Sequence, residues 1–230
     1  SRYGHGIGIR VGTLLEFPYG KATSIIRDFA KYADVPLINM ADDRFHPCQG
    51  LTDILTVQEK FPKYEGKKYV IMWGYSNRIR TWCSIHCDAL IMTRYGLDVT
   101  IAHPLGFDID PKVAEWCKEN AEDSGGHFQT SNDYKEALDG AHIVFPRSWV
   151  SNECVISGLD SFGKENELAI HEKYRDWMLT QELVDSMDKH AIVMHVMPVY
   201  RGMEATDEVM DSFHSVIINQ AENRLHTQMA

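Results

Sequence analysis

The stretch "YVIMWGYS", residues 69–76, decides the fold class. Its first five residues are all apolar or aromatic, without the alternation of a half-exposed strand. Continuous apolar runs of this kind are typical of strands that are buried on both faces of a sheet. Similar runs recur at 98–104, 141–146, 191–198 and 215–220, with a weaker one at 127–131.

Helical patterns separate these runs, at about 84–95, 111–122, 132–138 and 180–187. The second is the best delimited, because Asp110 can cap it, Pro111 suits the first helical position and Gly125 follows its end. Strands that alternate with helices predict an α/β fold, in which helices cover both faces of a parallel sheet.

The first 45 residues repeat this pattern on a smaller scale. "GIGIR" and "PLINM" are strand-like, and a helix is expected over about 22–33. We therefore predict two doubly wound parallel-sheet domains joined by a helix, the first domain incomplete and the second Rossmann-like. The predicted divisions are 1–45, the interdomain helix 46–62, the second domain 63–219 and the start of a C-terminal helix at 220–230. Because the chain begins with Ser1 and stops inside a helical pattern, we expect it to be a portion of a longer protein.

Composition and charge narrow the class of function. The formal charge of −10 argues against nucleic acid and anionic membranes as main partners. No apolar stretch approaches the ~20 residues of a membrane span. Five cysteines without paired spacing indicate reduced thiols and a cytoplasmic protein. Cys83 and Cys87 could share a helix face, but no second pair matches them, so we expect no metal site.

Ligands of open α/β sheets lie outside the carboxyl ends of the strands. The residues expected there are rich in Arg, His, Trp and Gln and poor in Asp and Glu, although the chain as a whole is acidic. This contrast indicates an anionic ligand. The positions concerned are Arg10, 46–49, 75–82, His103, 147–149, 195–201 and 220–224.

His46 and Gln49 stand at the start of the predicted interdomain helix. A helix N-terminus suits phosphate or a developing oxyanion, an imidazole can donate to a carbonyl oxygen, and an amide can hold an amide-like group. In the alternative interpretation the His-Pro pair only starts the helix and Gln49 faces solvent.

Two later segments carry similar ambiguity. In "MHVMPVYRG" the backbone carbonyls before Pro198 could accept hydrogen bonds from an ammonium group and Arg201 could hold an anion, or the segment is an ordinary strand exit with a core histidine. In "NQAENRLHTQ" we expect Arg224 to open a helix, where it could bind an anion or only carry surface charge.

Taken together and in this order, "FHPCQGLTDILTVQEKF", "MHVMP" and "EATDEVMDSFHSVIINQAENRLHTQMA" resemble the aspartate/ornithine carbamoyltransferase family. That family has a His-Pro-x-Gln motif on its interdomain helix, a His-Cys-Leu-Pro motif late in the second domain and a Glu-Asn-Arg motif on a late helix. The resemblance covers nearly the whole chain.

The resemblance implies a carbamoyltransferase, which moves the carbamoyl group of carbamoyl phosphate to the amine of an amino acid such as ornithine or an N-acylated ornithine and releases phosphate. The implied catalytic residues are His46, Arg10 and Arg224, which together with Gln49 would bind carbamoyl phosphate. No covalent intermediate and no cofactor are needed, because preorganised donors suffice for this chemistry. The family assembles as trimers that share active sites, so a homotrimer is implied.

Three features resemble the branch of N-acetylornithine and N-succinylornithine carbamoyltransferases, whose backbone is knotted. They are the long loop after residue 76, "KYRDWMLT" at 173–180 and "PRSW" at 146–149. A knot in the second domain is therefore part of the resemblance. The second-substrate residues implied are Arg147, Trp149, Val196, Met197, Pro198 and Arg201.

The departures from the family lie on the second-substrate side. Val196 and Met197 replace the Cys-Leu of the family motif, and the loop carries "NRIRTWCSIHC" where the branch has prolines and asparagines. The Ser-x-Arg-Thr-Arg phosphate loop has no counterpart in this sequence. A catalytically silent relative that binds or regulates is therefore an alternative. A nucleotide-dependent dehydrogenase is a weaker one, because no Gly-x-Gly-x-x-Gly follows residues 69–76.

Overall fold

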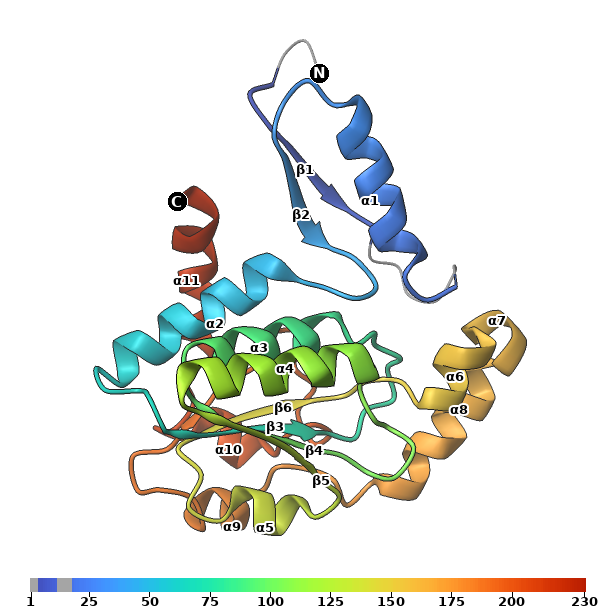
Figure 1. Cartoon of the computed structure of the whole chain (residues 1–230). Coiled ribbons are helices and arrows are strands. Elements are labelled where there is room, and N and C mark those ends of the chain that lie inside the picture. Colours follow the sequence, from blue (N-terminus) through green and yellow to red (C-terminus); the bar gives the residue numbers. More distant parts are fainter. Residues whose placement is uncertain (1–3, 12–17) are drawn as a thin grey trace.

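The computed structural model describes residues 4–11 and 18–230. Its described part forms two α/β units (Figure 1). In the smaller unit, strands β1 (Ile7–Arg10) and β2 (Leu37–Ala41) pair in parallel, and helix α1 (Lys21–Tyr32) lies alongside them. Helix α2 (Pro47–Lys60) then leads into the larger unit, as the sequence predicts.

The larger unit is built on a five-stranded sheet whose pairs are all parallel. The strands are β3 (Lys68–Trp73), β4 (Asp98–Ala102), β5 (His127–Ser131), β6 (Ile143–Arg147) and β7 (Ile192–Val193), in the order β5-β4-β3-β6-β7. One face carries α3 (Cys83–Arg94) and α4 (Pro111–Ser124). The other carries α5 (Tyr134–Leu138), α9 (Gln181–Asp185) and α10 (Asp207–Asp211) (Figure 1). The predicted α/β class, with a parallel sheet between helical layers, is confirmed.

The strand order sets where a ligand can lie. The chain moves outward from β3 to one edge through β4 and β5, then returns to the other side of β3 as β6. The crevice beyond the carboxyl ends of β3 and β6 is therefore the switch point at which ligands of such sheets bind. Residues 69–73 of β3 are fully buried, which confirms that this run is covered on both faces.

The helix that begins at Pro111 has the predicted signals. Asp110 Oδ1 accepts the Lys112 N–H at 2.9 Å, and Gly125 closes the helix with a φ of 80°, a left-handed conformation that favours glycine. Four further elements lie between β6 and α9 and follow no pattern that we used for prediction. They are α6 (Asn152–Ser157), α7 (Leu159–Phe162), α8 (Lys164–His171) and a 3-10 turn (Glu172–Tyr174).

The predicted strand at 215–220 is wrong. Only Ser215 forms an isolated bridge, with Val193, and α11 (Ile217–Met229) begins two residues later. A short apolar run does not distinguish a strand from a buried helical turn, and here Ile217, Gln220 and Asn223 are buried at helical spacing. Arg224 consequently lies in the second turn of α11 and does not open the helix.

Helix α11, near the end of the chain, packs on α2, the helix that leads into the larger unit. Asn223 Nδ2 donates to Thr56 Oγ1 at 3.1 Å and to Glu59 Oε2 at 2.7 Å. This contact brings Arg224 beside the first turn of α2. Across residues 4–11 and 18–230, no helix has the length and apolar character that a membrane crossing requires. A knotted backbone stays a prediction of the resemblance.

Candidate active site

A cavity of about 190 Å³ lies where the two units meet. It is lined by residues from separate segments that the fold brings together. They are Arg10, Ala41, Asp42, His46, Arg80, Thr81, Cys83, Ser84, Arg147, Val196, Met197, Pro198 and Arg224. Seven of the ten predicted site residues therefore face one cavity, at the switch point of the large sheet.

His46 is the N-cap residue of α2, but its side chain makes no capping hydrogen bond. Its backbone N–H donates instead to Cys87 Sγ at 3.1 Å. Burial, then Arg224 and Arg10, lower the pKa of His46 to about 3. The imidazole is therefore neutral at physiological pH, so one ring nitrogen carries a proton and the other a lone pair.

Arg224 lies against this imidazole. Its Nη2 is 3.5 Å from His46 Nε2, and its Nη1 donates to Gln49 Oε1 at 2.6 Å. If Arg224 donates to Nε2, the proton of His46 resides on Nδ1, which has no partner in the described part of the chain. This pair presents a cation and a neutral donor at one end of the cavity.

Gln49 does not line the cavity, and the alternative in which it faces solvent is wrong, because the residue is only 4% exposed. Its Nε2 donates to Asp53 Oδ1 at 2.7 Å, and Gln220 Nε2 donates to the same oxygen. Gln220 Oε1 in turn accepts the His195 N–H at 2.7 Å. Gln49 thus holds Arg224 in place from beneath the cavity.

Burial raises the pKa of Asp53 to about 7, although the hydrogen bonds from the two glutamines lower it. Asp88 lies next to it, fully buried, and its Oδ2 accepts the Tyr69 hydroxyl at 2.6 Å. Burial and the neighbouring carboxyl raise the pKa of Asp88 as well. Two neighbouring buried carboxyls do not both ionise readily, so this pair beneath the site carries at most one negative charge at neutral pH.

Arg147 forms the opposite wall. It is the last residue of β6 and is 7% exposed. Its Nε and Nη1 have no hydrogen-bond partner in the described residues. The nearest carboxylate is Glu204, 3.8 Å from Nη1, which already accepts the Ser148 N–H at 3.0 Å. Burial lowers the pKa of Arg147 to about 10, so the group is charged at neutral pH.

His195 shapes the third wall. It is fully buried, and its Nδ1 accepts the Met197 N–H at 2.9 Å while Nε2 lies 3.2 Å from Glu204 Oε2. This is the core histidine that the sequence left as an alternative. Met197 has a φ of 53° and is followed by a cis bond to Pro198. The histidine thus holds the turn that presents residues 196–198 to the cavity.

Besides Gln49, two further predicted site residues are not brought to the cavity. The Trp149 indole is fully buried in the core, where Nε1 donates to the Phe107 carbonyl at 2.8 Å. Arg201 is on the surface and forms ion pairs with Asp207 and Asp211, the second at 2.6 Å. Both side chains already have partners in the fold, so the predicted acceptor roles of these two residues find no support in the geometry.

Six of the lining residues were not among the predicted site residues, and two of these, Arg80 and Asp42, are charged. Arg80 lies within the stretch expected after β3, and the available sequence signal was a cation beyond a strand end in an acidic chain. No sequence signal identified Asp42, because its position depends on the turn after β2. Both of its carboxylate oxygens are occupied, by Asn39 and Thr23 and by the N–H groups of residues 44 and 45.

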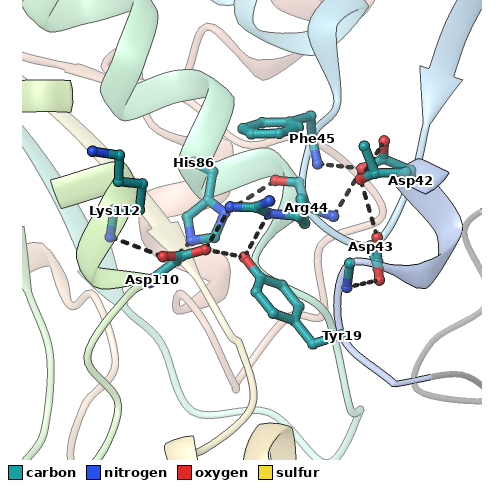
Figure 2. Close-up of polar contacts among 10 residues, drawn as sticks. Tyr19, Asp42, Asp43, Arg44, Phe45, His86, Asp110 and Lys112 are labelled. Atoms are coloured by element: carbon teal, nitrogen blue, oxygen red, sulfur yellow. Dashed lines mark hydrogen bonds and ion pairs between the residues drawn. The ribbon is translucent and has the colours of Figure 1, made fainter. Parts of the chain in front are cut away.

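A second polar cluster joins the two units near the cavity (Figure 2). Arg44 Nη2 and the Tyr19 hydroxyl both donate to Asp110 Oδ2 at 2.8 Å. His86 Nδ1 lies 3.0 Å from the Arg44 carbonyl, and the Asp110 N–H donates to His86 Nε2 at 3.4 Å. Because Tyr19 and Arg44 come from the smaller unit and the other two from the larger, this cluster fixes how the units face each other.

Comparison with known proteins gives the family. A sequence model described as "Aspartate/ornithine carbamoyltransferase, Asp/Orn binding domain" matches residues 65–230. The companion model, described as the carbamoyl-P binding domain, matches residues 1–59. The chain belongs to the aspartate/ornithine carbamoyltransferase family.

Named relatives of this chain fall in two groups. The N-acetylornithine carbamoyltransferase of Xanthomonas campestris pv. campestris is 34% identical over 100% of this chain and 67% of its own length. The ornithine carbamoyltransferase of Thermococcus kodakarensis is 37% identical over 89% of this chain and 60% of its own length. The chain therefore spans about 60% to 67% of the curated relatives that it matches.

Solved carbamoyltransferase structures have the same fold. A crystal structure of N-acetyl-L-ornithine transcarbamylase superposes with a TM-score of 0.90 at 33% identity, over 99% of this chain and 68% of the other. A mutant of that enzyme, complexed with carbamyl phosphate and N-succinyl-L-norvaline, gives a TM-score of 0.89 at 33% identity, over 99% of this chain and 67% of the other.

Proposed function

We propose that the protein is a carbamoyltransferase that moves the carbamoyl group of carbamoyl phosphate to the amine of an amino acid such as ornithine or an N-acylated ornithine. One observation carries this proposal. Arg10, His46 and Arg224, three of the four residues that the family resemblance assigned to carbamoyl phosphate, line one cavity together with Arg147 and the turn at 196–198. A silent relative that does not bind carbamoyl phosphate would have no need to keep this convergence of donors.

In the proposed reaction the neutral amine attacks the carbonyl carbon of carbamoyl phosphate. A C–N bond forms, the C–O bond to phosphate breaks, and the electron pair of that bond leaves with phosphate, which can take up the proton released by the nitrogen. Negative charge develops on the carbonyl oxygen before phosphate departs. Fixed donors aimed at this oxygen are the usual source of catalysis in such steps.

We assign the donors as follows. His46 and Arg224 would hold the carbamoyl oxygen, because they lie together at one end of the cavity. Arg10, at the end of β1, would contact the phosphate side. Gln49 would act by holding Arg224 rather than by touching substrate, which its 2.6 Å hydrogen bond to Nη1 supports. The carbonyls of residues 196–198 would receive the attacking amine.

The remaining proposals concern the whole protein. We propose a cytoplasmic homotrimer with shared active sites, supported by the family resemblance. All five cysteines are unpaired in the structure, which is compatible with a reducing compartment. The 1–45, 46–62, 63–219 and 220–230 divisions are proposed as its functional parts.

The test uses the complete protein and measures phosphate release from carbamoyl phosphate across a panel of amines. The panel contains ornithine, N-acetylornithine, N-succinylornithine, aspartate, putrescine and diaminopropionate. Turnover with one amine, lost in His46→Ala and Arg224→Ala, is the expected result. If carbamoyl phosphate neither reacts nor binds, the silent relative becomes the better interpretation.

A further inference from the structure

Two carboxyl groups lie beneath the cavity on neighbouring helices. Asp53 of α2 and Asp88 of α3 are both fully buried. The two helices approach closely beside them, because a Cβ at Gly50 would lie only 3.0 Å from the Cys87 carbonyl oxygen. Besides burial, which raises both pKa values, a side-chain hydrogen bond between the two carboxyls lowers the pKa of Asp53 and raises that of Asp88.

A hydrogen bond between two carboxyls requires a proton, because an ionised carboxylate can only accept. The oxygens free to share it are Asp53 Oδ2 and Asp88 Oδ1, which have no other hydrogen-bond partner in the described part of the chain. The remaining oxygens are occupied. Asp53 Oδ1 accepts from the amide groups of Gln49 and Gln220, and Asp88 Oδ2 accepts from the Tyr69 hydroxyl. One shared proton therefore satisfies the whole pair.

The surroundings decide which carboxyl keeps the negative charge. Asp53 accepts two N–H groups, and the positive charge of Arg224 favours an anion there. Asp88 accepts a single hydroxyl, and the charge of Asp53 disfavours a second anion beside it. Since donors and an opposite charge stabilise the ionised form, the proton belongs on Asp88 and the negative charge on Asp53.

The charge on Asp53 orients both glutamines. Because an ionised oxygen only accepts, each glutamine turns its NH2 group toward Asp53 and its carbonyl oxygen away. The Gln49 carbonyl oxygen then accepts from Arg224 at 2.6 Å, at the carbamoyl end of the cavity. The Gln220 carbonyl oxygen accepts the His195 N–H at 2.7 Å, next to the turn at 196–198. A single carboxylate oxygen thus fixes groups on two walls of the site.

We propose, on the basis of the function proposed above, that Asp53 and Asp88 are positioning residues of the carbamoyl transfer site. Asp88 is a neutral carboxylic acid that donates its proton to Asp53. Asp53 is an anion that holds Arg224 through Gln49, and it holds the turn at 196–198 through Gln220. Neither carboxyl touches substrate, and both act by fixing donors and acceptors before substrate binds.

Substitutions that copy one protonation state test this assignment in the complete protein. Asparagine resembles a neutral carboxylic acid, because its NH2 group donates and its oxygen accepts. Asp88→Leu should lower kcat about tenfold, the usual weight of a hydrogen bond to a charged group, and Asp88→Asn should restore most of this loss. Asp53→Asn should also lower kcat about tenfold, because it removes the anion that both glutamines and Arg224 face. Steady-state phosphate release at saturating substrates measures kcat, and Asp123→Asn on the exposed side of α4 is the control.

Infrared spectroscopy detects the proton directly and needs no turnover. Ordinary aspartates and glutamates are ionised at slightly alkaline pH. The parent protein should therefore show the carbonyl band of an un-ionised carboxylic acid there, and Asp88→Asn should lack it. Denaturant unfolding of each variant separates a loss of fold from a loss of positioning.

The outcomes separate the two proposals. The inference is overturned, while carbamoyl transfer stands, if Asp53→Asn keeps the parent kcat, if Asp88→Asn is as slow as Asp88→Leu, or if the parent protein lacks the infrared band. If no amine releases phosphate and titration calorimetry detects no binding of carbamoyl phosphate, carbamoyl transfer itself fails. The positioning role then fails with it, whereas the infrared band still decides whether the pair holds a proton.

Discussion

Two arginines of this protein, Arg44 and Arg147, lie beside carboxylates, and their surroundings differ. Arg44 donates to Asp110 at 2.8 Å, and the same carboxylate also accepts from Tyr19 and from the Lys112 N–H (Figure 2). Arg147 lies 3.8 Å from Glu204, with two of its nitrogens unpartnered in the described chain. The first cluster satisfies its polar groups and joins the two units. The second leaves them open toward a cavity.

The difference teaches how to tell a structural charge from a functional one. Folding alone favours partners for every buried donor, because an unsatisfied buried polar group costs free energy. Donors that stay open at a cavity wall are retained when a ligand uses them, at some loss of stability. Measurements on variants of both regions can break or sharpen this comparison.

The largest effect is expected from the carbamoyl end of the cavity. His46→Ala and Arg224→Ala should each lower kcat/KM by roughly 10²–10³, the usual loss for a donor to a developing oxyanion. Steady-state phosphate release measures this, and Arg94→Ala on the exposed end of α3 is the control. Arg224→Lys keeps the charge but cannot reach Gln49 and His46 together, so it should recover little. A loss of less than about threefold in both alanine variants would show that they are not oxyanion donors.

Arg147→Met tests the open arginine. We expect kcat/KM for the acceptor to fall roughly 10- to 100-fold, while the free energy of unfolding changes by less than about 1 kcal/mol. The physical reason is that the cost of burying the guanidinium offsets its long contact with Glu204. Denaturant unfolding and acceptor kinetics measure the two quantities. A destabilisation above about 3 kcal/mol would make Arg147 a structural charge like Arg44.

Asp110→Asn tests the satisfied cluster. Asparagine still caps α4, so the variant isolates the charge that meets Arg44. We expect a loss of about 1–2 kcal/mol in the free energy of unfolding. Asp123→Asn, on the exposed side of α4, serves as the control. Equal stabilities for the two variants would contradict the structural role.

The stability that the Arg44–Asp110 cluster contributes should also depend on pH in the acidic range. Burial pushes the pKa of Asp110 up, but the Tyr19 hydroxyl, the Lys112 N–H and Arg44 outweigh burial and hold it below its usual value. A carboxyl with a depressed pKa contributes stability at neutral pH that is lost as the pH falls toward its folded pKa. The difference in stability between Asp110→Asn and the parent protein should therefore become smaller in strong acid. Thermal unfolding as a function of pH measures this difference.

Two histidines, one in each region, should weaken the fold at mildly acidic pH. Burial lowers the pKa of His46 to about 3 and that of His86 to about 4. The unfolded chain binds protons at these positions below a pH of about 6.5, so stability falls as the pH decreases from there. Each histidine contributes at most about 1.4 kcal/mol per pH unit. His46→Gln should reduce the slope of Tm against pH between 6.5 and 4, and an unchanged slope would contradict a buried neutral imidazole.

The smallest effect is expected at Arg201, which the sequence placed with the second substrate. Its ion pairs with Asp207 and Asp211 are exposed, and such pairs contribute less than about 1 kcal/mol. Arg201→Ala should therefore change the free energy of unfolding by less than that, with a far smaller effect on acceptor KM than Arg147→Met. A tenfold rise in KM would restore the predicted role of Arg201.

Much of the site could be predicted because it depends on short segments. The His-Pro-x-Gln turn places His46 at a helix start, and apolar strands place Arg147 and residues 196–198 at strand ends. Gln49 was expected at the substrate, but the contact with α11 makes it a support for Arg224. Trp149 follows its strand as expected, yet packing rotates the indole into the core.

Sequence alone determined the α/β class, the parallel sheet and the family resemblance, because apolar runs and capping residues act within a few positions of the chain. Tertiary structure decided that 217–229 is a helix, which residues share the cavity and which arginines remain open. Those outcomes depend on contacts between residues far apart in the chain, such as Gln49 with Arg224 and Arg147 with Glu204. No local pattern encodes which donors such contacts leave unsatisfied.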